Sequence, residues 1–221
     1  MTAAMLRLCQ NKPLWERAAS FLWDTLHWVH PQRLSQLVPE MPLSFEKASP
    51  RLQRFAFVRL GITSCIHPFP VDDGSRFLLL DEVILRQLAL WLGALAYTRP
   101  LRSVMKGDDV RHLKTAFPGI YPEVLHELGW FLPDLPRLQA VVKDDALPSP
   151  DALEQTGWQL LFAHLSHLPE ALIHRFRLRF PLEMDTCWHI FPLWQTSPEH
   201  IVLLQRLLKR ISLGGYDLCC C

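Results

Sequence analysis

The chain has 221 residues, 49% of them hydrophobic, which is enough to bury a sizeable core. Its 23 Lys and Arg residues nearly balance its 22 Asp and Glu residues, so the formal net charge is only +1. No overall field is therefore available to attract nucleic acid or an anionic membrane. The composition predicts a folded chain and disfavours a nucleic-acid partner.

The most apolar stretch, VILRQLALWLGALAYTRP, runs from Val83 to Pro100 and resembles a membrane anchor. A membrane-spanning helix needs about 20 mainly apolar residues, whereas this run ends at Tyr97 and contains Arg86. We expect a buried helix with Trp91 in the core, and no direct membrane insertion. The N-terminal residues also lack the apolar run of a secretory signal, which predicts a cytoplasmic location.

Serine followed by proline marks three predicted helix starts, at Ser49-Pro50, Ser149-Pro150 and Ser197-Pro198. The serine oxygen can cap the first backbone N–H groups, and proline lacks an N–H that would be unpaired in the first turn. After Pro50, apolar residues recur at helical spacing, and Gly61 can end the helix in a left-handed turn. These residues are Leu52, Phe55, Phe57 and Val58.

Further helix starts are predicted at Pro13, Asp81, Asp108 or Asp109, and Pro122. Most residues therefore fall into helices, and the fold class is all-α. We predict a single compact helical domain over residues 1–221, with a loosely ordered C-terminal tail at 214–221.

One segment departs from the helical pattern. In HRFRLRFP, arginines alternate with apolar residues, which is the period of a half-buried strand. The pattern leaves open a short strand or hairpin around Phe176 or the end of a helix. In either case Arg175, Arg177 and Arg179 can offer a basic face to an acidic partner, or can simply be solvated.

Eight tryptophans are many for this length, and tryptophan serves both cores and interfaces. Trp188 and Trp194 flank a segment without a periodic face, so they are candidate exposed anchors for a partner. Together with Arg175, Arg177 and Arg179 they form the predicted partner-binding set.

Residue patterns for catalysis are weak. His27 and His30, like His164 and His167, have a spacing that can place two metal ligands on one helix face, but no familiar third ligand follows. The chain has no glycine-rich phosphate loop, no nucleophile elbow, and neither a zinc nor a disulfide spacing among its cysteines. We therefore expect no catalytic residue, metal or cofactor.

Three sequence blocks resemble, in order, the SctK (YscK-like) family of type III secretion systems. They are WVHPQRLSQLVP at 28–39, the segment from LALWLG to YPEVL at 88–125, and GWQLLFAHLSHLPEALIHRFRLRFP at 157–181. The prolines at Pro118 and Pro122 and the last forty residues depart from the family pattern.

The resemblance implies a mainly helical, non-enzymatic cytosolic adaptor, monomeric on its own. It would link the cytosolic domain of the inner-membrane ring protein to the pod protein of the sorting platform. Two alternatives remain open from the residues. One is a helical metalloenzyme using the histidine pairs with Glu170, and the other is a helical nucleic-acid-binding module suggested by Arg175–Arg179 and Lys209-Arg210.

Overall fold

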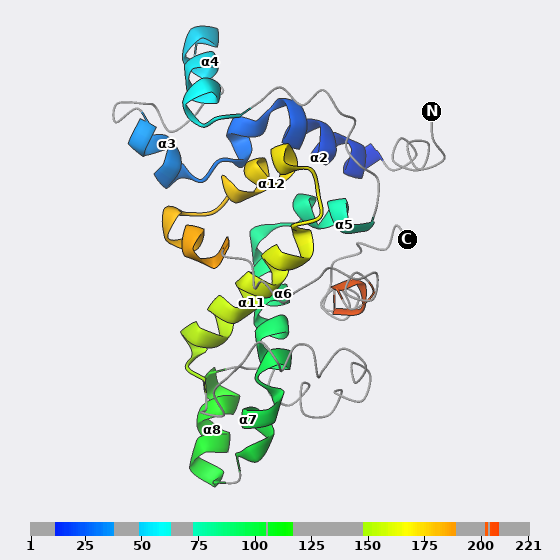
Figure 1. The fold of residues 1–221 in the computed structure, drawn as a ribbon, viewed down its shortest axis with the longest axis vertical. Coiled ribbons are helices and arrows are strands. Elements are labelled where there is room, and N and C mark those ends of the chain that lie inside the picture. Colours follow the sequence, from blue (N-terminus) through cyan, green and yellow to red (C-terminus); the bar gives the residue numbers. More distant parts are fainter. Residues whose placement is uncertain are drawn as a thin grey trace. The chain divides into compact units, whose positions relative to one another are not determined.

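A computed structural model describes residues 12–37, 49–62, 73–104, 106–116, 148–188, 202 and 204–207. Every regular element within these ranges is a helix, and none is a strand, which confirms the all-α prediction (Figure 1). No helix in the described ranges is long and apolar enough to cross a membrane. The predicted starts at Pro122 and Ser197-Pro198, and the tail at 214–221, lie outside the described residues.

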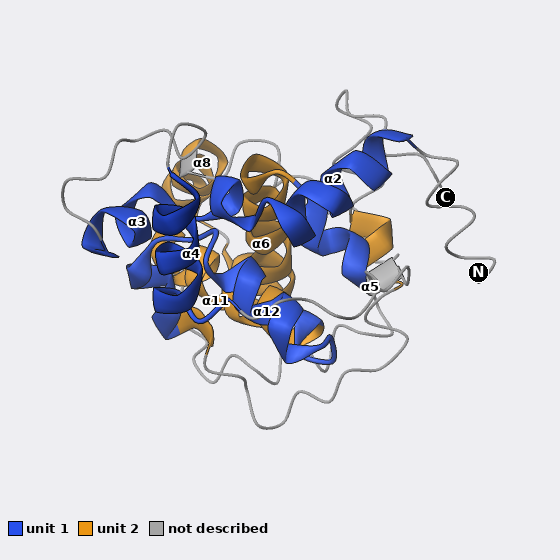
Figure 2. Ribbon diagram, turned by 90° about the horizontal axis from the view of Figure 1, so that it is seen from above, with its two compact units in different colours: residues 1–80, 165–186 blue, residues 81–164, 187–221 orange. Residues whose placement is uncertain are grey.

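Backbone contacts divide the chain into two compact units, coloured separately in Figure 2. Unit 1 comprises residues 1–80 and 165–186, and unit 2 comprises residues 81–164 and 187–221. The prediction of a single domain is not tested by this division and stays a prediction.

Unit 1 brings together helices from two separate stretches of the chain. Its elements are α2 (Lys12–Trp23), η1 (Thr25–Trp28), α3 (Pro31–Leu37), α4 (Pro50–Arg59), α5 (Asp73–Arg76), η3 (Phe77–Leu79), α12 (Glu170–Arg177) and most of η5 (Leu182–Trp188). A hydrophobic cluster of Leu26, Val29, Ala56, Ile62 and Leu178 joins η1, α4 and the end of α12.

Helix α4 has the ends that its sequence predicts. The Oγ of Ser49 accepts a hydrogen bond from the backbone N–H of Leu52 at 3.4 Å, and Pro50 takes the first helical position. Gly61 follows the helix with φ of 65°, a conformation that side chains with a Cβ rarely adopt. Both local signals are confirmed.

The buried face of α4 differs from the apolar stripe in the sequence. Phe55 and Val58 are 47% and 72% exposed, whereas Ala56 is fully buried. Leu52 is half-buried, and Phe57 packs against the cluster around Ala56. The small Ala56 side chain therefore faces that cluster, and the larger Phe55 and Val58 side chains lie on the exposed side of the helix.

Unit 2 contains α6 (Glu82–Ala96), α7 (Thr98–Ser103), α8 (Gly107–Ala116) and all but the last residue of α11 (Pro150–Leu165). The expected buried helix is confirmed as α6, in which Trp91 is 7% exposed. Asp81 precedes α6 without a side-chain cap bond, while Ser149 accepts a hydrogen bond from Ala152 N at 3.1 Å. Helix α8 begins one residue before Asp108, so Asp108 and Asp109 lie in its first turn.

Two glycines let α6 and α11 touch backbone to backbone. A Cβ added to Gly157 would lie 1.7 Å from Ala89 O, and one added to Gly93 would lie 2.1 Å from Leu153 O. An ion pair between Arg86 Nε and Glu154 Oε1, at 2.8 Å, spans the same two helices. Only residues without a side chain allow this approach, so the crossing depends on both glycines.

Candidate interaction surface

The alternating arginines belong to the end of a helix. Helix α12 extends through Arg177, and Leu178 continues in a right-handed helical conformation. Alternate residues on a helix differ by about 200° in direction, so Arg175, Arg177 and Arg179 do not share one face. The single basic face that a strand would provide is not formed.

Arg175 lies in the interior of unit 1, where it is 2% exposed. Its guanidinium donates hydrogen bonds to the backbone carbonyl of Leu22 and to the hydroxyl of Thr25, at the end of α2. Thr25 Oγ1 in turn donates to Phe21 O at 3.1 Å. Arg175 therefore supplies donors to the carbonyls that α2 leaves unpaired at its C-terminus.

Arg179 secures a different segment of the same unit. Its guanidinium donates to the carbonyl oxygens of Leu78 and Leu80, the latter at 2.6 Å. It also lies over the ring of Trp28, 4.6 Å from the ring centroid, which is within cation–π range. The residue thus joins the end of η3 to η1.

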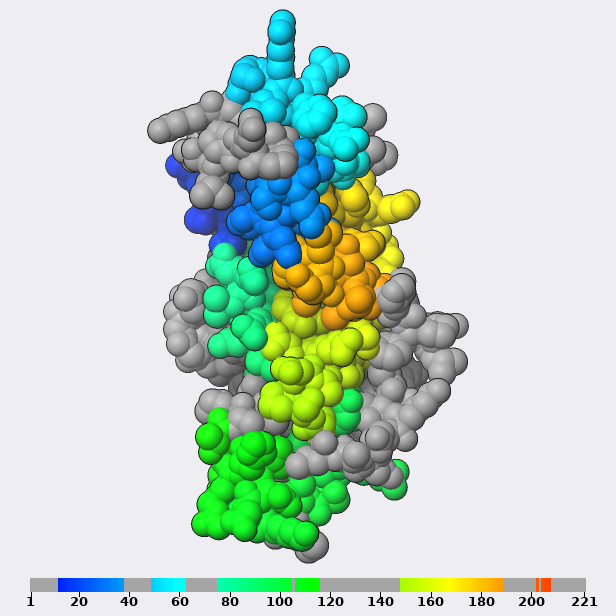
Figure 3. Space-filling model, turned by 90° about the vertical axis from the view of Figure 1, so that its left-hand side faces the viewer, coloured from blue at the N-terminus to red at the C-terminus, as the bar shows by residue number. Residues whose placement is uncertain are grey.

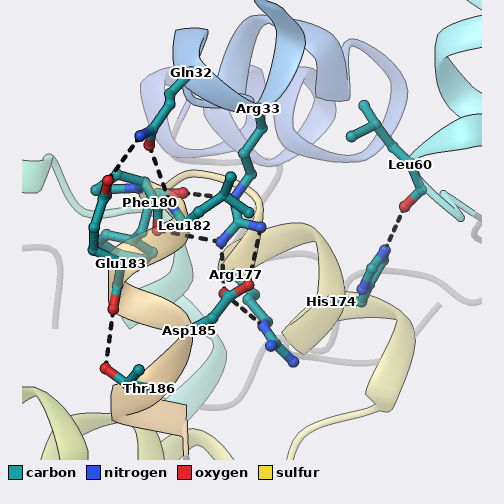
Figure 4. A network of polar contacts seen from close by, with 11 residues as sticks. Gln32, Arg33, Leu60, His174, Arg177, Phe180, Leu182, Glu183, Asp185 and Thr186 are labelled. Carbon is teal, nitrogen blue, oxygen red and sulfur yellow. Dashed lines mark hydrogen bonds and ion pairs between the residues drawn. The ribbon is translucent and has the colours of Figure 1, made fainter. Parts of the chain in front are cut away.

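Arg177 has a side chain that is 41% exposed. Its Nε donates to Asp185 Oδ1 at 2.9 Å. Arg33 of α3 binds the same carboxylate at two points, with Nη2–Oδ1 at 2.6 Å and Nη1–Oδ2 at 3.3 Å (Figure 4). Arg33 also donates through Nε to Phe180 O at 2.6 Å. Asp185 therefore holds two helices to η5.

The two arginines control the ionisation of Asp185. Partial burial opposes its charged form, but hydrogen bonds from Arg33 and then Arg177 outweigh that effect. The pKa of Asp185 consequently lies below its ordinary value of 3.8. The carboxylate stays ionised, and the network stays intact, throughout the neutral pH range.

Trp188 is half-buried in unit 2, where its ring stacks on Phe162 with centroids 3.7 Å apart and planes 7° from parallel. Phe162 also stacks on the buried Trp158 at 5.4 Å. Trp194 lies outside the described residues. Partner binding by the five predicted residues stays a prediction, and Arg175 has no exposed surface with which to meet a partner.

The histidines singled out for metal binding make contacts within the chain. His27 Nε2 lies 3.0 Å from Asp24 Oδ2, and His164 Nδ1 donates to Leu160 O at 2.7 Å. Among the described residues, no three His, Cys, Asp or Glu side chains converge in a geometry that could hold a metal ion.

The outer face of α4 is a candidate site that the sequence analysis did not identify. Arg51, Arg54, Phe55, Val58 and Arg59 are all exposed, and the sequence of α4 contains no acidic residue. The signal was present in the spacing, because positions 51, 54, 55 and 58 follow the i, i+3, i+4, i+7 pattern of one helix face.

Comparison with known families decides the classification. The chain matches the family described as YOP proteins translocation protein K (YscK) over residues 6–219, nearly its whole length. The chain belongs to the YscK family. No curated protein and no solved structure matches it. Members of the YscK family are components of type III secretion systems.

The blocks that resemble the YscK family meet in the folded chain. His30 N, in the first block, donates to Leu178 O, in the third, at 2.8 Å. Gly93, in the second block, and Gly157, the first residue of the third, form the crossing of α6 with α11. These contacts give the resembling residues a packing role in the two units.

Proposed function

We propose that the chain is a non-enzymatic adaptor of a type III secretion system. It links the cytosolic domain of the inner-membrane ring protein to the pod protein of the sorting platform. The observation that carries this proposal is the match to the YscK family over residues 6–219. In this role the chain works in the cytoplasm, held at the inner membrane by protein contacts.

The structural roles of the conspicuous polar residues support an adaptor. Arg33 and Asp185 join α3 to η5, Arg175 anchors the end of α2, and His174 Nε2 donates to Leu60 O at 2.7 Å. Polar side chains of unit 1 thus fix helices against one another. This arrangement suits a protein that binds its partners through rigid outer surfaces.

Affinity purification from a secreting cell tests the proposal. A tagged copy at its native expression level should recover both the inner-membrane ring protein and the pod protein, identified by mass spectrometry. Cells that lack the pod protein provide the control, because the ring protein should still be recovered from them. Recovery of neither component from wild-type cells would contradict the adaptor role.

A further inference from the structure

Helix α4 presents an unusual combination of side chains on its outer face. Phe55 and Val58 are 47% and 72% exposed and lie one helical turn apart. Arg51 and Arg54 are exposed beside them, and the Arg59 guanidinium lies 6.0 Å from the Phe55 ring centroid. In Figure 3 the α4 segment, in cyan, stands at the surface of the molecule.

The rest of unit 1 holds this face in place. Ala56 and Phe57 pack against the hydrophobic cluster on the inner side of α4. Ser49 caps the first turn, and the hydrogen bond from His174 to Leu60 O ties the last turn to α12, as Figure 4 shows. A partner would therefore meet a preformed surface and would not bear the entropic cost of ordering it.

No acidic residue of α4 balances the positive charge of its arginines. The ten residues of α4 include three arginines and no acidic residue. Within the described ranges, none of the ion pairs involves Arg51, Arg54 or Arg59. Arginine next to an exposed aromatic residue is a combination enriched at protein interfaces, and guanidinium groups bind carboxylates at two points.

We propose that the outer face of α4 docks an acidic segment of a protein partner, with carboxylates on Arg51 and Arg54 and apolar side chains over Phe55 and Val58. A protein is favoured over a nucleic acid or a membrane because the whole chain carries a net charge of only +1. Both of those ligands need a wider basic field or a larger apolar face than one ten-residue helix supplies.

The proposal rests on the proposed adaptor function, since it assigns a binding surface for one component of the secretion apparatus. Photo-crosslinking in secreting cells tests it directly. The full chain carries p-benzoylphenylalanine in place of Val58 or, as a control, in place of Val83, which is 67% exposed at the start of α6. The Val58 position should yield an adduct with an acidic segment of a ring or pod protein, and the Val83 position should not.

Charge reversal supplies the second arm. The double variant Arg51→Glu, Arg54→Glu should reduce recovery of that component at least about tenfold. The double variant Arg102→Glu, Lys114→Glu changes the charge equally at exposed positions of unit 2 and should keep wild-type recovery. Circular dichroism of each purified variant checks that the fold is retained.

The outcomes separate this proposal from the adaptor role. If wild-type chain recovers the apparatus but the α4 variant recovers it equally well, the docking surface is refuted and the adaptor stands. If wild-type chain recovers no apparatus component, the adaptor role fails first. An adduct at position 58 with a second copy of the chain would overturn the acidic-segment proposal. Binding to phosphatidylglycerol vesicles is measured for the wild type and the α4 variant as well. If the variant loses only this vesicle binding and keeps its protein partners, the proposal is also overturned.

Discussion

Arg33 and Asp185 form a two-point ion pair although 152 positions separate them in the chain. The Arg33 side chain is 8% exposed and that of Asp185 is 29% exposed, so water screens the pair only partly. Arg177 binds the same carboxylate from α12. One acidic side chain thereby fixes three segments of unit 1.

Replacing Asp185 with Asn should lower the free energy of unfolding by about 1–3 kcal/mol, because the buried Arg33 loses its charged partner. Urea denaturation followed by circular dichroism measures the change. Asp109→Asn is the matched control, since Asp109 is exposed in the first turn of α8. A loss at Asp185 no greater than at Asp109 would show that the network contributes nothing to stability.

The contribution of Asp185 should depend on pH in a defined direction. Its pKa is lower in the folded state, so the unfolded chain binds its proton first as the pH falls. The stabilisation is complete at pH values above the pKa of Asp185 in the unfolded chain, which is near 4. It is lost as the pH drops through the pKa of the folded state. The difference in stability between wild type and Asp185→Asn should therefore be constant from pH 7 to 5 and shrink below pH 4. A difference that grew in acid would contradict this assignment.

Replacing Gly157 with Ala should destabilise unit 2 by at least about 3 kcal/mol, because the new Cβ would lie 1.7 Å from Ala89 O. The loss should appear although alanine favours a helix over glycine by about 1 kcal/mol. Gly107→Ala is the control, because a Cβ there meets nothing within 4 Å. Thermal unfolding of both variants measures the contrast, and equal midpoints would refute the close crossing.

Replacing Arg175 with Ala should cost about 1–3 kcal/mol of unfolding free energy, since it leaves buried acceptors at Leu22 and Thr25 without their donor. Arg102→Ala, at an exposed position of α7, should change stability by less than about 0.5 kcal/mol. Guanidinium denaturation of both variants compares them. Wild-type stability in Arg175→Ala would indicate that the residue is not a structural anchor.

Local signals in the sequence predicted helix ends well where the capping residue and its backbone partner lie within one helical turn. The Ser49 cap and the positive φ of Gly61 were both confirmed. The sequence left open whether Arg175–Arg179 forms a strand or the end of a helix, because an alternating pattern of five residues fits both. The structure shows that it is the end of α12. The metal-ligand spacing of the histidines was equally local and did not determine their partners.

By itself, the sequence determined the all-α class, the serine caps of α4 and α11 and the burial of α6, because these depend on residues a few positions apart. Only the tertiary structure decided which apolar and basic side chains face outward. Ala56, rather than Phe55 or Val58, meets the core, and Arg175 reaches carbonyls more than 150 positions away. Such choices depend on the volume and the unpaired acceptors of distant segments, which no local pattern encodes.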